Sequence, residues 1–352
     1  MLTTVIAFII ILMVLIIAHE LGHFVSAKAS GVKVEEFGLF LPPRLFSVKR
    51  GETRYSVNAI PLGGFVRMAG EEDPNELRSL ASKRIPIRLV VLGAGSLMNL
   101  LLPLLLLGIS FMVPHKVVTG QVEVVEVAPN SPASAAGIEA GDIFISVNGQ
   151  PVQNIGDLTR YFYRNIGTQF DAEIRRTDST IEVVQLTARR KPPEGEGAVG
   201  VAVRILDPEI TKQSYPFWQA VPLGAGRYGE LFVLFKNGVV SMMVGAEPVE
   251  ITGPVGIAQL TGEVARLGIS PLLEFASIIS INLAIINIFP IPPFDGGRIV
   301  FVLLEWVRRG KRVSPNTERL IHTVGFLLLI AAFVAITYND IMRFISGESL
   351  LS

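Results

Sequence analysis

Two histidines and a glutamate lie close together near the start of the chain, at the end of an uncharged run. His19, Glu20 and His23 belong to the segment AHELGH, which follows residues 2–18 without a charged side chain between them. On a helix, His19 and His23 are four positions apart and share one face. Two such imidazoles can supply two ligands of a tetrahedral zinc ion, and Glu20 can reach a water at an open position. The spacing therefore predicts zinc-dependent attack of water on a carbonyl group, with Glu20 as the general base.

A catalytic zinc ion needs a third protein ligand, and the sequence has no cysteine to supply one. Asp295, in the segment NIFPIPPFDGGR, follows a helix that prolines interrupt. Irregular backbone at membrane depth is tolerated only inside protein or beside a watery cavity, so Asp295 is the best candidate. Alternatively, Asp295 makes only a turn or caps the next helix. His115, in an outer loop, and His322, at the start of the last apolar segment, are weaker candidates.

The composition is that of a membrane protein. Half of the 352 residues are apolar and 18% are charged. Four segments are apolar over a length that crosses the hydrocarbon core: residues 2–24, 87–113, 272–291 and 320–338. The first is expected to be a membrane helix and not a cleavable signal, because no basic region precedes the apolar run and no small-residue cleavage site follows it. Ionisable groups at membrane depth are costly, which favours a functional site at AHELGH over polar groups that merely end a helix.

Charge and cysteine content exclude several classes of function. The 31 basic and 31 acidic residues balance, so no overall positive field attracts nucleic acid. The absence of cysteine excludes disulfides, thiolate metal sites and a cysteine nucleophile.

The loops predict how the chain crosses the membrane. Residues 28–88 carry eleven basic and seven acidic residues, and residues 298–319 carry six basic and two acidic residues. Positively charged loops stay in the cytoplasm, so the termini and the region between the second and third spans are expected outside. His19 then lies near the cytoplasmic end of the first span, and Asp295 emerges from the third span at the same depth. The two motifs should therefore meet.

Residues 117–207 have the composition of a soluble domain. Strand patterns in GQVEVVEVAP, IFISVNGQPV, FDAEIRR and TIEVVQLTA alternate with turns and with a helical stretch, IGDLTRYFYRN. Their order, with the pattern SPA-x-x-AGI-x-x-GD-x-I-x-x-VNG, resembles a PDZ domain of the bacterial protease-associated type. Such a domain could hold bulky extracytoplasmic domains away from the membrane, or it could simply bind peptide C-termini.

Two further segments flank the spans. Residues 53–68 alternate like a strand that runs into a Gly-Gly turn. Residues 217–244 mix aromatic with charged side chains, which is typical of an interfacial amphipathic helix.

The motifs together resemble the site-2 protease family, specifically the bacterial RseP-like zinc intramembrane proteases. The matching features are HExxH in the first span, N-x-x-P-x-P-x-x-DGG from Asn287 to Gly297 in the third, and the PDZ-like insertion between them. The resemblance implies that His19, His23 and Asp295 bind zinc and that Glu20 is the catalytic base. It also places Asn287 near the substrate and relates IPLGGFVRM to the membrane-associated β-loop of the family.

One motif departs from the family pattern. Where members often have Gly-Pro-x-x-Asn in the second span, this chain has GSLMN at residues 95–99. Asn99 remains a candidate substrate contact.

A peptide bond inside a transmembrane helix is protected by the helix's own hydrogen bonds, so cleavage requires local unwinding and new partners for the freed groups. Strand 53–60, with Val57, Asn58 and Ala59, is predicted to supply them by pairing with the unwound substrate. Alternatively, this hairpin only plugs a cytoplasmic loop.

These observations predict a polytopic α-helical membrane protein with about four transmembrane helices, a membrane-associated β-loop and an inserted extracytoplasmic PDZ-like α+β domain. The expected parts are residues 1–116, the PDZ-like domain at 117–207, a linker at 208–270 and a C-terminal membrane part at 271–352. The expected function is zinc-dependent cleavage of single-span membrane proteins, such as anti-sigma factors or remnant signal peptides, in the bacterial cytoplasmic membrane. The alternative is a non-enzymatic membrane scaffold that binds peptides through the PDZ-like domain. Metal transport is disfavoured, because the ionisable groups form one cluster and no path across the bilayer.

Overall fold

The computed structural model describes the whole chain except residues 1, 72, 194, 246–251 and 347–352. The chain forms two compact units. We call Met1–Ser110 together with Ile251–Ser352 the helical unit, and Phe111–Glu250 the sheet unit.

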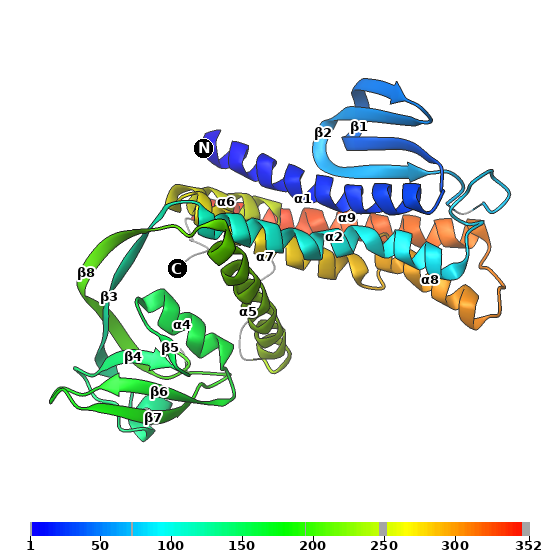
Figure 1. The fold of residues 1–352 in the computed structure, drawn as a ribbon. Coiled ribbons are helices and arrows are strands. Elements are labelled where there is room, and N and C mark those ends of the chain that lie inside the picture. The colour runs from blue at the N-terminus through cyan, green and yellow to red at the C-terminus, as the bar shows by residue number, and fades with distance from the viewer. Residues whose placement is uncertain (1, 72, 194, 246–251, 347–352) are drawn as a thin grey trace. The chain divides into compact units, whose positions relative to one another are not determined.

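Long helices dominate the helical unit (Figure 1). Its elements are α1 (Leu2–Ala29), β1 (Val34–Arg50), β2 (Thr53–Met68), α2 (Ile85–Met112), α6 (Pro254–Leu267), α7 (Ile269–Ile288), α8 (Asp295–Val307) and α9 (Pro315–Ser346). Four of the described helices, α1, α2, α7 and α9, are long and apolar enough to cross a membrane, as the sequence predicts. Helix α5, which covers the predicted interfacial segment 217–244, is not among them.

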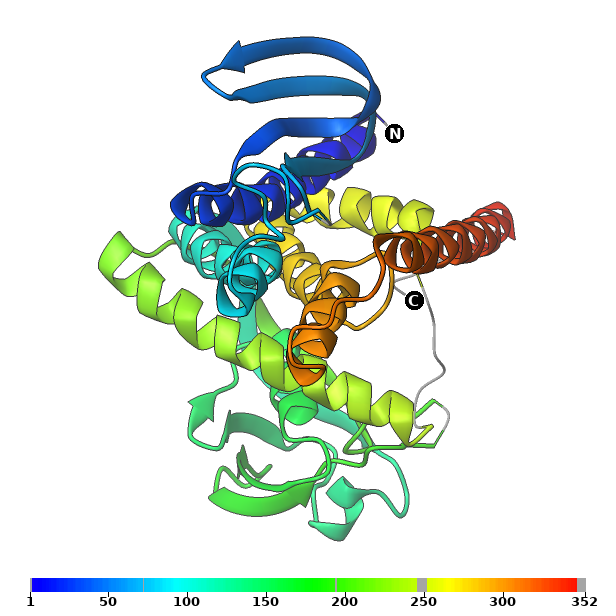
Figure 2. The same cartoon turned by 90° about the vertical axis from the view of Figure 1, so that its right-hand side faces the viewer.

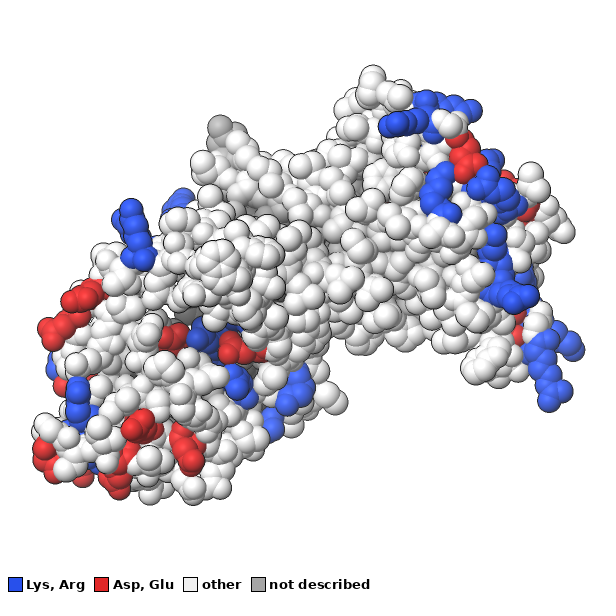
Figure 3. Space-filling model, in the orientation of Figure 1, with Lys and Arg blue, Asp and Glu red and all other residues white. Residues whose placement is uncertain are grey.

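Apolar contacts hold these helices together and leave much apolar surface exposed. Ile11 and Leu15 of α1, Leu106 of α2 and Ala276 of α7 form one buried cluster. Along the same helices the visible surface is nearly free of charge, and charged side chains gather at the end that bears the β-strands (Figure 3). An uncharged belt of this kind is typical of helices that face lipid.

The break between α7 and α8 follows from its prolines. Helix α7 ends at Ile288, two residues before the first proline of PIPP, because proline cannot donate the helical hydrogen bond. The chain turns there, with Phe294 N–H donating to Ile291 O at 3.0 Å, and Asp295 begins α8. The predicted proline-broken helix is confirmed.

Strands β1 and β2 fold back on themselves into a small sheet beside α1 (Figure 2). Their register gives four antiparallel rungs in the order 44–50, 53–58, 36–39 and 64–67. Rung 53–58 is interior, because Val57 pairs with Leu39 on one side and with Phe46 on the other. Rung 64–67 is an edge, since among the described pairings it contacts only rung 36–39.

The sheet unit is an α+β structure. Its elements are β3 (His115–Val127), α3 (Pro132–Ala135), β4 (Ile143–Val147), β5 (Gln150–Pro151), α4 (Ile155–Arg164), β6 (Gln169–Arg175), β7 (Ile181–Thr187), β8 (Val201–Gln213) and α5 (Phe217–Met243). The sheet order is β7-β6-β4-β3-β8, with β5 paired to β4. The four predicted strand segments and the predicted helical stretch, which is α4, are all present.

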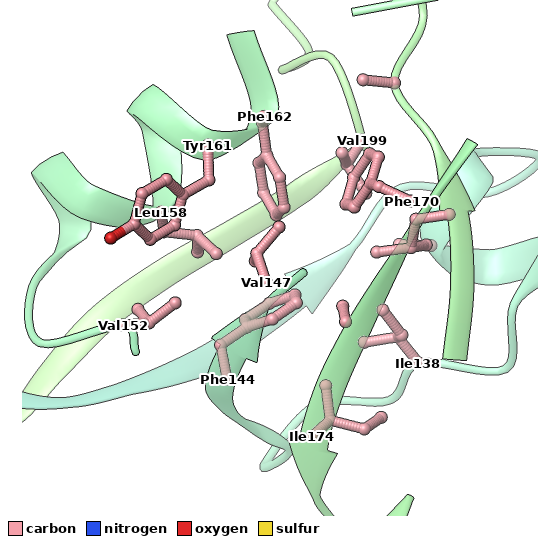
Figure 4. Close-up of a cluster of buried hydrophobic side chains, with 14 of the residues drawn as sticks. Ile138, Phe144, Val147, Val152, Leu158, Tyr161, Phe162, Phe170, Ile174 and Val199 are labelled. Carbon is pink, nitrogen blue, oxygen red and sulfur yellow. The ribbon is translucent and has the colours of Figure 1, made fainter. Parts of the chain in front are cut away.

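A single apolar core organises this unit (Figure 4). Leu158, Tyr161 and Phe162 of α4 face Phe144 and Phe170 of the sheet, as the 3.6-residue period of α4 requires. Helix α5 docks on the end of α4, where Asn237 Nδ2 donates to the carbonyls of Tyr163 at 2.7 Å and Arg164 at 3.1 Å. Both carbonyls lie in the last turn of α4, where a helix has no intrahelical donors for its carbonyls.

Candidate active site

Three side chains from distant parts of the sequence converge in the helical unit. His19 Nε2 lies 3.2 Å from His23 Nε2, and each of these nitrogens lies 3.2 Å from Asp295 Oδ2. A tetrahedral zinc ion with bonds of about 2.0–2.1 Å has its ligand atoms roughly 3.3 Å apart. The three atoms therefore have the mutual spacing of three corners of a zinc tetrahedron, and two imidazoles with one carboxylate are a common donor set for catalytic zinc.

A backbone hydrogen bond orients His23. Its Nδ1–H donates to Val91 O of α2 at 2.9 Å. That bond places the proton on Nδ1 and leaves the Nε2 lone pair toward His19 and Asp295. Metal-binding histidines are usually oriented in this way by a second hydrogen bond, so the surroundings of His23 also fit a metal ligand.

Two asparagine side chains approach His19 from α2 and α7. Asn99 Nδ2 and Asn287 Nδ2 each lie 3.4 Å from His19 Nδ1. Asn99 Oδ1 is buried and has no hydrogen-bond partner among the described residues. A half-turn of the Asn99 amide exchanges the two ends, so that Oδ1 accepts a hydrogen bond from His19 Nδ1–H and the buried oxygen gains a partner. This again leaves Nε2 of the histidine for a metal.

Helix α2 approaches the histidines at a glycine. A Cβ atom on Gly95 would lie 2.3 Å from His23 Nε2 and 2.7 Å from His19 Nε2. Any other residue would therefore occupy the space of the two rings. The sequence contains this glycine but gives no sign that it faces AHELGH, because that depends on how α1 and α2 cross.

The three candidate ligands open onto a cavity of about 810 Å³. Glu20 lines it, together with the edge rung 64–67, Met68 after it, Glu71 and Arg298. Glu20 therefore shares this cavity with the candidate metal site, as a general base requires. Nearby, Glu305 of α8 accepts a hydrogen bond from Arg88 of α2 at 2.6 Å.

Two buried carboxyl groups elsewhere in the helical unit are held in the charged form. Burial raises the pKa of Glu305, but the hydrogen bond and charge of Arg88 and the contact with Arg312 outweigh it, and the pKa lies below its ordinary value. Burial likewise raises the pKa of Glu36 in the β1–β2 sheet. Hydrogen bonds from Ser56 and Arg44 outweigh that effect and lower the pKa.

None of the predicted substrate contacts, Asn99 and Asn287 included, lines the cavity. Val57, Asn58 and Ala59 belong to the interior rung 53–58 or follow it, and none of them lines the cavity. Asn58 Nδ2 donates to Leu39 O at 3.2 Å and to Phe40 O at 2.9 Å, so it stabilises a bend in β1. Rung 53–58 is already paired on both sides, so it offers no free edge for the predicted pairing of strand 53–60 with substrate. The alternating pattern identified a strand but not its neighbours.

Comparison with protein families decides the class of this site. The family model described as Peptidase family M50 matches residues 7–332. The chain belongs to peptidase family M50. The matched region contains AHELGH and the DGG segment, so the predicted resemblance to site-2 proteases is confirmed.

Curated relatives of this M50 chain agree with that assignment. A putative zinc metalloprotease of Clostridium perfringens is 34% identical, and the match covers 93% of this chain and 95% of that protein. Zinc metalloprotease RasP of Shouchella clausii is 30% identical, with 97% of this chain and 100% of RasP covered. The PDZ domain of an SdrC-like protein from Listeria monocytogenes aligns with 25% of this chain at 17% identity and a TM-score of 0.22.

The M50 chain is accordingly a zinc metalloprotease, and its apolar helices make it an integral membrane protein whose substrates are membrane proteins. Several residues around the site could not be identified from the sequence. Val91 acts through its backbone, which carries no residue-specific signal. Gly64 follows another glycine in a turn-like motif, and its contact with Glu20 depends on tertiary structure.

Proposed function

We propose that this M50 peptidase hydrolyses peptide bonds within the transmembrane segments of single-span membrane proteins, with His19, His23 and Asp295 as zinc ligands. The observation that carries the proposal is the mutual 3.2 Å spacing of three ligand atoms, two on the apolar helix α1 and one at the start of α8, seven residues after the apolar helix α7 ends. Membrane-embedded ligands have no evident use in cleaving soluble peptides, because such peptides do not reach that depth. Substrates of this class include anti-sigma factors and remnant signal peptides.

The chemistry follows from the cavity. Bound zinc supplies Lewis acidity, which makes water acidic enough to lose a proton near neutral pH. The Glu20 carboxylate accepts that proton as the water oxygen attacks the scissile carbonyl carbon, and it then protonates the leaving amide nitrogen. Val91 O accepts His23 Nδ1–H, and Asn99 Oδ1 accepts His19 Nδ1–H after the half-turn of its amide, so both rings are held through Nδ1. Asn287 also lies close enough to the site to contact a bound substrate.

The substrate is held, in this proposal, by the edge rung 64–67 and not by rung 53–58. An unwound transmembrane segment exposes backbone N–H and C=O groups that need partners in a dry environment. The edge rung lines the cavity beside Glu20 and pairs on one side only, so it can accept an extended peptide as an added strand. A Cβ on Gly64 would lie 2.7 Å from Ile16 Cγ2 and 3.0 Å from Glu20 Cγ, so glycine permits the close approach to α1.

The topology proposed from the charged loops completes this picture. The metal site faces the cytoplasmic side of the bacterial inner membrane, and the termini and the sheet unit lie outside the cytoplasm. The charge that gathers at the end of the helical unit with the β-strands supports this orientation (Figure 3). The sheet unit, as a PDZ-like domain, either excludes substrates with bulky outer domains or binds their peptide ends. Helix α5 lies at the membrane interface.

Purified enzyme with a single-span anti-sigma segment tests the proposal. We expect cleavage inside the span, loss of cleavage with chelator, and recovery when zinc is returned. Glu20→Gln should keep zinc and lose cleavage. A scaffold without enzymatic activity would bind the segment without cutting it, whether or not Glu20 is replaced, and that result would reject the peptidase proposal.

A further inference from the structure

One carboxylate joins the edge rung to the helix that carries Asp295. Glu71 Oε1 accepts the backbone N–H of Met68, the last residue of β2, at 3.1 Å. Glu71 Oε2 accepts a hydrogen bond from Arg298 Nη1 at 2.5 Å. Arg298 lies three residues after Asp295, in the first turn of α8. Glu71, Met68 and Arg298 all line the cavity that contains Glu20.

The edge rung and α8 also have hydrogen-bond anchors of their own. Beyond β2, Ala69 N–H donates to Lys33 O at 2.9 Å, which ties the end of the rung back to the start of β1. Helix α8 is tied at its other end, where Glu305 binds Arg88. Met68 and Val302 of α8 belong to one apolar cluster, but apolar contact has no preferred direction and permits sliding. The Glu71–Arg298 contact is directional.

We propose that the Glu71–Arg298 ion pair sets the distance between the edge rung and the metal ligand Asp295, and thereby selects which peptide bond of the substrate is cut. This inference rests on the proposed function, because it requires a substrate strand on the edge rung. Arg298 and Glu71 are positioning residues in this proposal, since they act through the rung and through α8.

Strand geometry predicts how far the cleavage site should shift when the ion pair is broken. Successive residues of a strand point to opposite faces, so a bound strand slips in steps of two residues, which is roughly 6.6 Å. The new bond at the metal site would then be two residues from the normal one. The side chains of Arg298 and Glu71 are 43% and 24% exposed, so the pair contributes little to the stability of the fold. A variant that breaks the ion pair should therefore change the position of the cut without unfolding the enzyme.

The test measures where the full-length, zinc-loaded enzyme cuts a single-span substrate that the wild type cleaves. Glu71→Gln retains an oxygen acceptor for Met68 N–H but loses the charge. Mass spectrometry of the product termini should show a second cut two residues from the first. The ratio kcat/KM at the original bond should fall about 3- to 10-fold, with zinc content unchanged. Arg298→Met should reproduce the second cut.

The swapped double variant Glu71→Arg with Arg298→Glu should restore a single cut, because it restores the pair with reversed charges. The matched control is Glu52→Gln. Glu52 binds Lys28 at 2.6 Å and Arg78 at 2.7 Å at the β1–β2 turn and does not line the cavity, so this variant should cut as the wild type does. Single cuts at the wild-type bond with unchanged kcat and KM in both single variants would overturn the inference. A wild type that cuts no membrane substrate would instead overturn the proposed function.

Discussion

Gly95→Ala tests the placement of the metal site most directly, because it adds one carbon at the point where α2 faces the histidines. That carbon would lie 2.3 Å from His23 Nε2 and 2.7 Å from His19 Nε2. Non-bonded carbon and nitrogen atoms settle at about 3.5 Å, so at least one ring must move by roughly 1 Å. Zinc–nitrogen bonds are about 2.0–2.1 Å long and tolerate about 0.2 Å, so that ring can no longer coordinate.

Gly95→Ala should weaken zinc binding and slow cleavage, and the fold should stay intact. Alanine is a better helix former than glycine by about 1 kcal/mol, which partly offsets the local crowding. Loss of one zinc ligand should weaken zinc binding by at least about 100-fold, because even outer hydrogen-bond partners of ligands contribute 10- to 100-fold. Cleavage should fall by at least about 100-fold, since a displacement near 1 Å already has that effect on a rate.

The assay compares Gly95→Ala with two glycine variants on the same helix. Gly93 and Gly108 have no atom within 4 Å of an added Cβ among the described residues, so Gly93→Ala and Gly108→Ala should keep zinc and activity. Zinc per protein, zinc affinity by competition with a chelator, and cleavage of a single-span substrate are measured for all three. A Gly95→Ala enzyme with wild-type zinc affinity and cleavage would refute the geometry, because the rings could not then face α2 at this position.

Other changes separate the roles of the charged groups. Glu20→Gln should retain zinc but slow cleavage by at least about 100-fold, because no carboxylate accepts the proton; metal analysis beside turnover checks this. Asp295→Ala should lower zinc affinity, which chelator competition measures, and unchanged affinity would remove Asp295 from the ligand set. Glu305→Gln should lower the free energy of unfolding by about 3–5 kcal/mol, because Arg88 stays buried with a weaker partner. The lowered pKa of Glu305 means that its contribution is complete above its ordinary pKa of 4.5 and is lost as the pH falls through the lower folded value. The difference in melting temperature between wild type and Glu305→Gln should therefore become smaller as the pH is lowered from 7 to 3.

Local patterns predicted much of the helical unit. Hydropathy identified all four apolar helices, because a span needs a continuous apolar length that is visible in the sequence. The spacing of His19 and His23 indicated a shared helix face, and the prolines before Asp295 indicated the break between α7 and α8. Strand β1 was not predicted. Its rungs depend on pairing with β2, and no local period reveals which strand will be interior and which will be an edge.

The sequence by itself determined the chemistry available to this protein: two imidazoles one helical turn apart and a neighbouring carboxylate within an apolar segment, and an aspartate shortly after another apolar segment and its proline break. These are local properties of residue type and spacing, and they also identify the family. Tertiary structure decided how that chemistry is arranged. The crossing of α1 and α2 at Gly95, the approach of edge rung 64–67 to Glu20, and the contact of Glu71 with Arg298 each join residues far apart in the chain. Such contacts arise from packing and not from spacing, because a side chain's neighbours depend on how whole helices and strands come together.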